Sequence, residues 1–259
     1  VEPKHLPKEN VPITFDHVSF KYANAEENVL EDIHFTASPE ETVAFIGSTG
    51  SGKTTLVNLL PRFFDVTEGS IRFGDIDIRD VSQKELRDRI GYVPQKGILF
   101  SGTIASNLRY ADESLSDEKM EEALSVSQSK EFVDLMPNGV NEPIAQGGTN
   151  VSGGQKQRLS IARALAKDAQ VYIFDDTFSA LDYATDAKLR AALAELITKK
   201  HATVFIVAQR ISSIMHADKI IVLNQGKMAG IGTHEELLNN CEVYQEIAHS
   251  QLSREELGE

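Results

Sequence analysis

The chain has 259 residues, of which 41% are hydrophobic, so it can bury a substantial core in one large domain or in two closely joined smaller ones. Its formal net charge is −13, from 26 basic and 39 acidic residues, which repels nucleic acid and anionic lipid head groups and argues against a nonspecific nucleic-acid binder. Cys241 is the only cysteine, which excludes a disulfide framework or a cysteine zinc site and favours a reducing, cytosolic setting.

The first part of the chain predicts a linker followed by antiparallel β structure. Val1–Pro12 contains three prolines and mixed charges, as linkers do. Apolar and polar residues then alternate in Ile13–Phe15 and in Val18–Phe20, which predicts a half-buried strand. A second strand pair is expected within Ser70–Ile76, turning at Gly74 and Asp75.

Four apolar runs predict a parallel sheet, because strands buried on both faces of such a sheet are continuously apolar. They are Val43–Ile46, Val171–Phe174, Val204–Val207 and Ile220–Leu223. Each run is far shorter than the ~20 residues of a membrane-spanning helix. Thr103–Arg109 and Ser116–Met136 carry apolar residues at helical spacing, which predicts an inserted helical segment.

The stretch Gly47–Thr55 follows the first apolar run and fits the pattern G-x-x-x-x-G-K-[ST], which predicts a strand, a phosphate-binding loop and a helix that begins near Lys53. Glycines let backbone N–H groups close around phosphates, Lys53 supplies a point charge, and the Thr54 hydroxyl can ligate Mg²⁺. The helix would direct the positive end of its dipole at the anion. The predicted ATP-binding residues of this loop are Gly47, Ser48, Thr49, Gly50, Ser51, Gly52, Lys53, Thr54 and Thr55.

Two later features complete a nucleotide-binding pattern. Asp175 and Asp176 end a predicted buried strand, and ligands of open α/β folds bind beyond the carboxyl ends of strands, so Asp175 is expected at Mg²⁺. Val151–Gln155 is rich in glycine and precedes the helical pattern Lys156–Ala166, which suits it to phosphate oxygens. One ATP does not need two such loops. We therefore expect two domains of this kind to meet across a shared interface.

From about Ile13 to its C-terminus, the chain resembles the nucleotide-binding domain of an ATP-binding-cassette (ABC) transporter. Besides the phosphate loop, the motifs are Gly91–Gln95 as the glutamine loop, Val151–Gln155 as the family signature and Ser179–Asp182 as the dimer-contact loop. Ile98–Leu108 resembles the exporter branch rather than the importer branch. The resemblance implies an α/β fold: a P-loop NTPase core with a mostly parallel sheet, an N-terminal antiparallel β subdomain and an inserted α-helical subdomain.

The resemblance also implies an organisation and a set of partners. Residues 13–259 would form the nucleotide-binding domain, with a helical subdomain at roughly 96–160 that touches the transmembrane domain of the same transporter. Residues 1–12 would be the linker from a missing membrane domain. The implied cofactors are ATP and Mg²⁺, and the implied partners are that transmembrane domain and a second nucleotide-binding domain, with no nucleic acid. The implied location is the cytoplasmic face of the cell membrane.

Individual roles follow from the same resemblance. Tyr22 would stack on adenine, and the alternative is a strand aromatic packed on the core. Thr54, Gln95 and Asp175 would surround Mg²⁺, and Asp176, Gln209 and Gln95 would take part in catalysis. The residues that would meet the nucleotide from the signature and the dimer-contact loop are Ser152, Gly153, Gly154, Gln155 and Asp182.

Two departures from the family pattern fall at the catalytic position. Asp176 stands where the family usually has a glutamate that polarises the attacking water, so the carboxylate is one methylene shorter. A general base must come within about 2.6–3.2 Å of its proton, and a shortfall of about 1 Å can cost roughly 100-fold in rate. Gln209 stands where the family usually has a histidine, and an amide cannot carry the imidazolium charge or relay a proton. Val151 replaces a leucine of the signature, and Gln146 replaces a glutamate common in exporters, which puts coupling through that loop in doubt.

These departures favour one half of a heterodimeric exporter, such as certain bacterial multidrug exporters and the antigen-peptide transporter, with an impaired site of its own. It would power efflux of a drug, lipid or peptide, which the sequence does not identify. The alternatives are a nonhydrolysing ATP-gated dimerisation module, a homodimeric exporter ATPase with slow turnover, and a soluble cassette protein of translation or DNA repair. The seven histidines show no metal-ligand spacing, and His201, His216 and His234 are predicted to be surface or packing residues.

Overall fold

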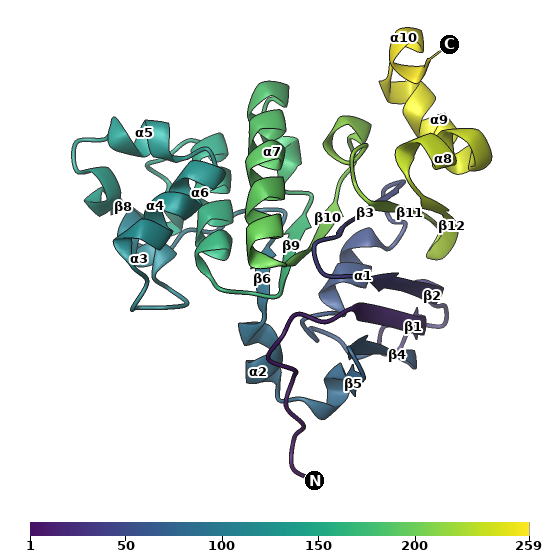
Figure 1. The fold of residues 1–259 in the computed structure, drawn as a ribbon. Helices are drawn as coiled ribbons and strands as arrows, with labels where there is room; N and C mark the ends of the chain where they lie inside the picture. The colour runs from purple at the N-terminus through teal and green to yellow at the C-terminus, as the bar shows by residue number, and fades with distance from the viewer. Residues whose placement is uncertain (259) are drawn as a thin grey trace.

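The computed structural model describes residues 1–258 and is built on a large and a small sheet (Figure 1). The large sheet has the strand order β12-β11-β3-β10-β9-β6, in which β12 alone is antiparallel to its neighbour. Its strands are β3 (Thr42–Gly47), β6 (Ile90–Val93), β9 (Val171–Asp175), β10 (Thr203–Val207), β11 (Lys219–Asn224) and β12 (Lys227–Gly232). The four apolar runs are thus confirmed as strands of a mostly parallel sheet.

The small sheet is antiparallel, in the order β2-β1-β4-β5. Its strands are β1 (Ile13–Phe20), β2 (Leu30–Ala37), β4 (Glu68–Phe73) and β5 (Ile76–Asp77). The predicted antiparallel portion and its turn at Gly74 and Asp75 are confirmed. A two-stranded ribbon, β7 (Gly102–Thr103) with β8 (Pro143–Ile144), completes the β structure of the described residues.

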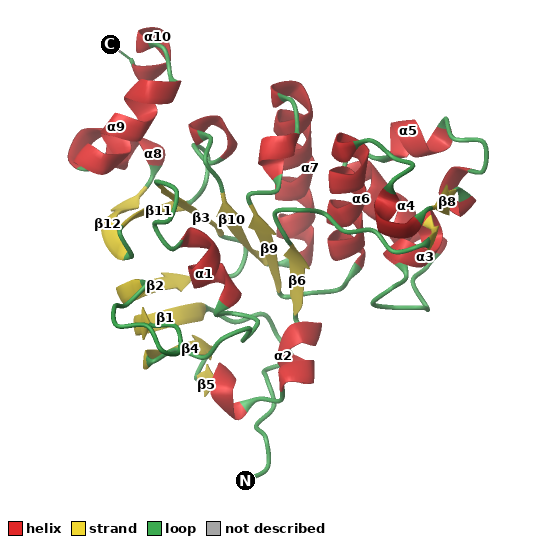
Figure 2. Ribbon diagram, turned by 180° about the vertical axis from the view of Figure 1, so that it is seen from behind, coloured by secondary structure: helices red, strands yellow, loops and turns green. Residues whose placement is uncertain are grey.

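Helices cover both sides of the large sheet (Figure 2). They are α1 (Lys53–Asn58), α2 (Gln83–Asp88), α3 (Ile104–Leu108), α4 (Asp117–Val126), α5 (Lys130–Asp134), α6 (Gly153–Ala166), α7 (Tyr183–Lys200), α8 (His234–Asn240), α9 (Glu242–Gln251) and α10 (Arg254–Leu257). Short 3₁₀ turns link several of them. None of the helices in residues 1–258 is both long enough and apolar enough to span a membrane.

Alternation along the central strands divides the core into two layers. In β3, Val43 and Phe45 face the small sheet and α1, whereas Ala44 and Ile46 face the helical layer that contains α6 and α7. The layer between the sheets holds an aromatic cluster in which the Phe45 ring lies 5.6 Å from that of Phe205. A strand buried on both faces must be apolar at every position, which explains the continuous runs in the sequence.

The helical segment expected over Ser116–Met136 consists of two helices, α4 and α5. α4 ends at Val126 because Gln128 takes a left-handed backbone with φ 61°, and the Ser129 N–H donates to Leu124 O at 2.8 Å. The Gln128 N–H donates to Ser125 O at 3.1 Å, which completes a Schellman stop. An asparagine or glycine usually marks such a stop, so the apolar spacing alone concealed it.

Residues 1–12 lie across one edge of the large sheet. The Pro7 carbonyl accepts from Arg89 Nη1 at 2.8 Å and from Gln170 Nε2 at 3.3 Å, and Asn10 Nδ2 donates to His201 O at 2.6 Å. Arg89, Gln170 and His201 lie just before the N-terminal ends of β6, β9 and β10. The segment therefore crosses the starts of three neighbouring parallel strands, opposite the edge where their carboxyl ends meet.

Candidate functional site

The phosphate loop runs between β3 and α1 with two glycines in left-handed conformations. β3 reaches Gly47 and α1 begins at Lys53, and between them Gly50 has φ 79° and Gly52 has φ 100°. A Cβ on Gly47 would lie 2.3 Å from the Leu223 carbonyl oxygen of β11, so only glycine fits there. A Cβ on Gly50 would meet no other atom within 4 Å, so the loop is not packed against other elements at this residue.

Lys53 is buried within this loop, and its ammonium bonds to the main chain. The residue is 8% exposed, and Nζ donates to Gly47 O at 2.6 Å. Burial lowers the pKa of Lys53, while the nearby Asp176 and Asp175 carboxylates act in the opposite direction. The Ser51 hydroxyl is also buried and makes no hydrogen bond. A buried ammonium and an unsatisfied hydroxyl are the groups that an anion in the loop would satisfy.

Two buried carboxylates lie at the carboxyl end of β9. Asp175 Oδ1 accepts from Thr54 Oγ1 at 3.0 Å, and Asp176 Oδ2 accepts from Gln95 Nε2 at 3.2 Å. Burial raises the pKa of both carboxyl groups. Asp176 has a left-handed backbone with φ 50°, and its N–H donates to Val207 O at 2.8 Å. The fold thus brings together side chains from the phosphate loop, the glutamine loop and β9.

These residues fit a magnesium nucleotide. Hydroxyl, amide and carboxylate oxygens from Thr54, Gln95 and Asp175 are the hard ligands that Mg²⁺ takes. The raised pKa values mean that burial makes the charged carboxylates costly, so a bound cation would compensate them. The Lys53 ammonium and the unsatisfied Ser51 hydroxyl are the groups that would bind the phosphates.

Gln209 lies beside the phosphate loop in a hollow of about 390 Å³. Ser48, Thr49 and α9 line the same hollow. Gln251 of α9 binds the loop that carries Gln209 at two main-chain groups: its Nε2 donates to Gln209 O at 2.7 Å, and its Oε1 accepts from Ile211 N at 2.8 Å. Sequence reasoning missed Gln251, because no local pattern relates it to a loop 42 residues earlier.

The residue after Gln209 ties this loop to the dimer-contact loop. Arg210 donates to Phe178 O at 2.5 Å and to Leu181 O at 3.1 Å, and it also donates to Asp186 Oδ2 at 2.9 Å. Ser213 Oγ donates to the same carboxylate oxygen at 2.6 Å. This buried network holds the two loops together, and no local pattern in the sequence predicts it.

Tyr22 lies just after β1 and is 38% exposed. Its hydroxyl is 3.0 Å from Thr55 Oγ1, and its ring makes edge contacts with Phe20 and Phe64. The side chain is therefore not sealed within the core. It lies next to the last residue of the phosphate loop, where a flat ligand could stack on it.

The signature and Asp182 lie on other elements. Ser152 caps α6, with its Oγ accepting from Gln155 N at 3.1 Å, and a Cβ on Gly153 or Gly154 would meet nothing. Asp182 caps α7. α6 packs on α3, α4 and β6, whereas α1 packs on β3, β9 and β10. The two phosphate-type loops of one chain thus belong to different layers of the molecule.

Comparison with known proteins agrees with this geometry. The ABC transporter family model matches residues 30–179. An uncharacterised ABC transporter ATP-binding protein of Mycobacterium tuberculosis is 48% identical over 90% of this chain and 40% of that protein. An ATP-dependent lipid A-core flippase of Albidiferax ferrireducens is 40% identical over 96% of this chain and 42% of its own length. The structure of a bacterial Atm1-family ABC exporter with ATP bound matches 97% of this chain and 43% of its own, with a TM-score of 0.91 and 33% identity. The chain spans less than half the length of these relatives.

Proposed function

The chain belongs to the ABC transporter family, and on this premise we propose that it is the ATP-binding and ATP-hydrolysing domain of an exporter, acting at the cytoplasmic face of a membrane. The likeness to an Atm1-family exporter and to lipid A-core flippases supports the exporter branch. The cargo would be a drug, lipid or peptide recognised by a transmembrane domain.

Each part of the site has a proposed task. Backbone N–H groups of the phosphate loop and Lys53 bind the phosphates, and Tyr22 stacks on the base. Thr54, Gln95 and Asp175 hold Mg²⁺, which supplies positive charge to the phosphate oxygens when bound. The remaining task, positioning the water that attacks the nucleotide, falls to Asp176.

We further propose that this site hydrolyses ATP poorly, and the observation that carries this proposal is how Asp176 is held. The residue is 8% exposed, its carboxylate accepts a hydrogen bond from Gln95 at 3.2 Å, and its main-chain N–H is bonded to Val207 O. A side chain held in this way cannot extend to make up for the missing methylene. Gln209 lies at the same phosphate loop but supplies only a neutral amide.

We also propose a second, competent nucleotide-binding domain as the partner. The capped N-terminus of α6 presents Ser152 with open space in front of Gly153 and Gly154, as required to meet a nucleotide held by another chain. In such a heterodimer, this chain contributes an intact signature loop to the partner's site and receives the partner's loop at its own impaired site.

A groove beside the glutamine loop is consistent with binding to a transmembrane domain. Phe63 and Tyr110, which are 46% and 67% exposed, line a hollow of about 230 Å³. Arg163 also lines it, with the guanidinium 5.1 Å from the Phe100 ring and with a buried Nη1 that makes no hydrogen bond. Exposed aromatic side chains beside an unsatisfied cation are typical of a protein interface, so we assign this groove to the transmembrane domain.

The test is the rate of Mg·ATP hydrolysis by the purified chain and by a double variant, Asp176→Glu with Gln209→His, over a series of chain concentrations. Lys53→Ala provides the background rate and should also abolish ATP binding; retained affinity would contradict the binding role of the loop. We expect the parent to be close to this background and the double variant to be faster by roughly 100-fold.

The other outcomes select the alternative functions. If parent and double variant hydrolyse alike and well above background, the departures are tolerated, and a homodimeric exporter with slow turnover is the better explanation. If ATP drives association without phosphate release even with a competent partner domain present, the chain is an ATP-gated dimerisation module.

A further inference from the structure

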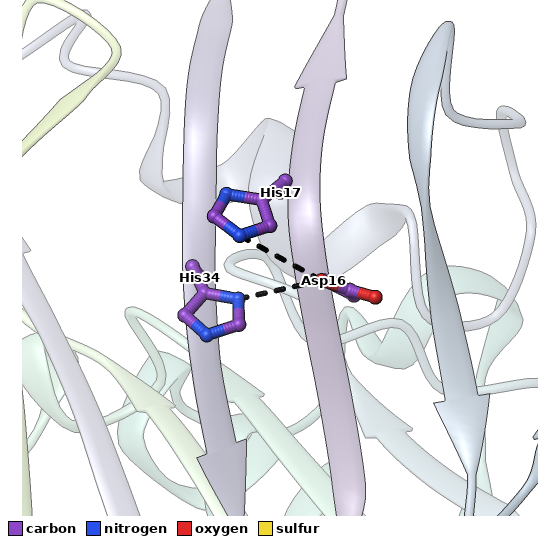
Figure 3. A group of neighbouring side chains, drawn as sticks. All are labelled: Asp16, His17 and His34. Atoms are coloured by element: carbon purple, nitrogen blue, oxygen red, sulfur yellow. Dashed lines mark ion pairs between the residues drawn. The ribbon is translucent and has the colours of Figure 1, made fainter.

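Two histidines and two aspartates gather on the outer face of the small sheet, away from the phosphate loop. The pairing of β1 with β2 shifts register between Phe15 and Val18, so that Asp16 and His17 together oppose His34. His17 has a left-handed backbone with φ 48°. Neighbouring side chains of a regular strand point to opposite faces, whereas this bulge leaves both Asp16 and His17 on the outer face beside His34 (Figure 3).

Three possible metal ligands converge there. His17 Nε2 lies 3.9 Å and His34 Nδ1 lies 3.6 Å from Asp16 Oδ1, and the three ligand atoms lie within 4.8 Å of one another. These distances are too long for hydrogen bonds. Ligand atoms around a tetrahedral ion with bonds of about 2.0–2.1 Å are separated by about 3.3 Å, so small side-chain movements would close a coordination shell.

Hydrogen bonds with neighbouring residues also orient two of the three possible ligands, His17 and Asp16. Asp32, which has a left-handed backbone with φ 49°, accepts a hydrogen bond through Oδ1 from His17 Nδ1 at 2.6 Å. With the proton on Nδ1, the Nε2 lone pair faces Asp16, which is the carboxylate–histidine arrangement found behind many metal ligands. Arg72 Nη1 donates to Asp16 Oδ2 at 3.0 Å, which leaves Oδ1 as the free oxygen towards both imidazoles.

Residues with left-handed backbones lie at this point on both strands. A left-handed conformation at a residue other than glycine costs about 1–2 kcal/mol, and His17 and Asp32 both adopt it on adjacent strands. Bulges of this kind re-aim side chains at functional positions. The two bulges are what bring the imidazoles, Asp16 and Asp32 together.

We propose that Asp16, His17 and His34 form a binding site for a divalent metal ion of the zinc class. Two imidazole nitrogens and one carboxylate oxygen favour zinc over Mg²⁺, which prefers oxygen ligands. A water would complete four-coordination, because the side chains of His17 and His34 are 64% and 54% exposed. The ion would join β1 to β2 at the bulge.

The test is competition for Zn²⁺ between the full chain and a chromophoric chelator, without nucleotide and with Mg²⁺ in excess to occupy the carboxylates of the phosphate site. We expect one equivalent of Zn²⁺ to bind, with affinity reduced at least about 10-fold in His34→Gln and in His17→Gln, and by about 10–100-fold in Asp32→Asn. Zn²⁺ should also raise the urea midpoint of the parent but not that of His34→Gln.

The matched control is His201→Gln. His201 is an exposed histidine that also pairs with one carboxylate, Glu40 Oε1 at 2.7 Å, but it is not part of the His17 cluster. Its substitution should leave the Zn²⁺ affinity unchanged. The proposal is overturned if the parent binds no more Zn²⁺ than the His17→Gln, His34→Gln double variant, or if His201→Gln weakens binding equally. Since the substituted side chains are exposed, Mg·ATP binding by each variant serves to verify that the chain is folded.

Discussion

Asp186→Ala should destabilise the domain strongly, because Asp186 is a buried anion with three donors on it. Its side chain is 1% exposed and accepts from Arg190 Nε at 2.7 Å, from Arg210 Nη2 at 2.9 Å and from Ser213 Oγ at 2.6 Å. Removing one partner of a buried ion pair costs about 3–5 kcal/mol, since the other charge is left uncompensated.

The structure places the expected cost at the lower end of that range. Both arginine side chains are 21% exposed, and Arg210 keeps the Phe178 and Leu181 carbonyls as acceptors. We therefore expect a loss of about 3 kcal/mol in the free energy of unfolding. With an m-value of about 3 kcal/mol/M for a chain of this size, the urea midpoint should fall by about 1 M.

The assay is urea unfolding of the parent, Asp186→Ala and the control Asp88→Ala. Asp88 pairs with Lys84 one helical turn away, but these side chains are 58% and 88% exposed, so its removal should cost only about 0.3–0.5 kcal/mol. If Asp186→Ala falls within about 1 kcal/mol of Asp88→Ala at an unchanged m-value, the buried network does not stabilise the domain as argued.

Two further predictions concern the C-terminal helices. Gln251→Ala removes two hydrogen bonds to the main chain of the Gln209 loop, worth about 1–2 kcal/mol, so the rate of amide hydrogen exchange in that loop should rise about 10-fold. The control Ser250→Ala loses only a hydrogen bond within α9 and should leave this exchange rate unchanged. Burial lowers the pKa of His234, and the charge of His216 lowers it further. The contribution of neutral His234 to the free energy of unfolding is therefore complete above the unfolded pKa near 6.5 and is lost as pH falls through the folded pKa. His234→Gln should therefore flatten the fall in unfolding free energy between pH 7.5 and 5.5, and an unchanged slope would contradict this assignment.

Much of the fold could be predicted because its signals are local. A strand buried on both faces appears in the sequence as a continuous apolar run, which predicted β3, β9, β10 and β11. The glycine-rich turn before Lys53 marks the phosphate loop and predicted the start of α1. β2 was not predicted because the bulge at Asp32 interrupts the alternation of apolar and polar residues. β12 was not predicted because two of its six residues are glycines, which lack the side chains that mark a strand. The break after Val126 depends on a glutamine in a left-handed conformation, which has no reliable sequence signal.

In the candidate site, too, some residues could be predicted from the sequence and others could not. Residues proposed to contact a phosphate or a metal follow motifs with a chemical reason for each residue type, so Lys53, Thr54 and Asp175 could be chosen as candidates from the sequence alone. Supporting residues could not, because Gln251, Asp186 and the pair of His17 and His34 acquire their neighbours only when distant segments fold together. No spacing between those residues reveals that they meet.

The path of residues 1–12 has a mechanical consequence. The segment is bonded to the residues that precede β6, β9 and β10, so it connects the starts of three neighbouring strands. Separation of these strand ends must therefore break hydrogen bonds to the segment, which resists opening of the sheet at the end opposite to the carboxyl edge where the phosphate loop lies.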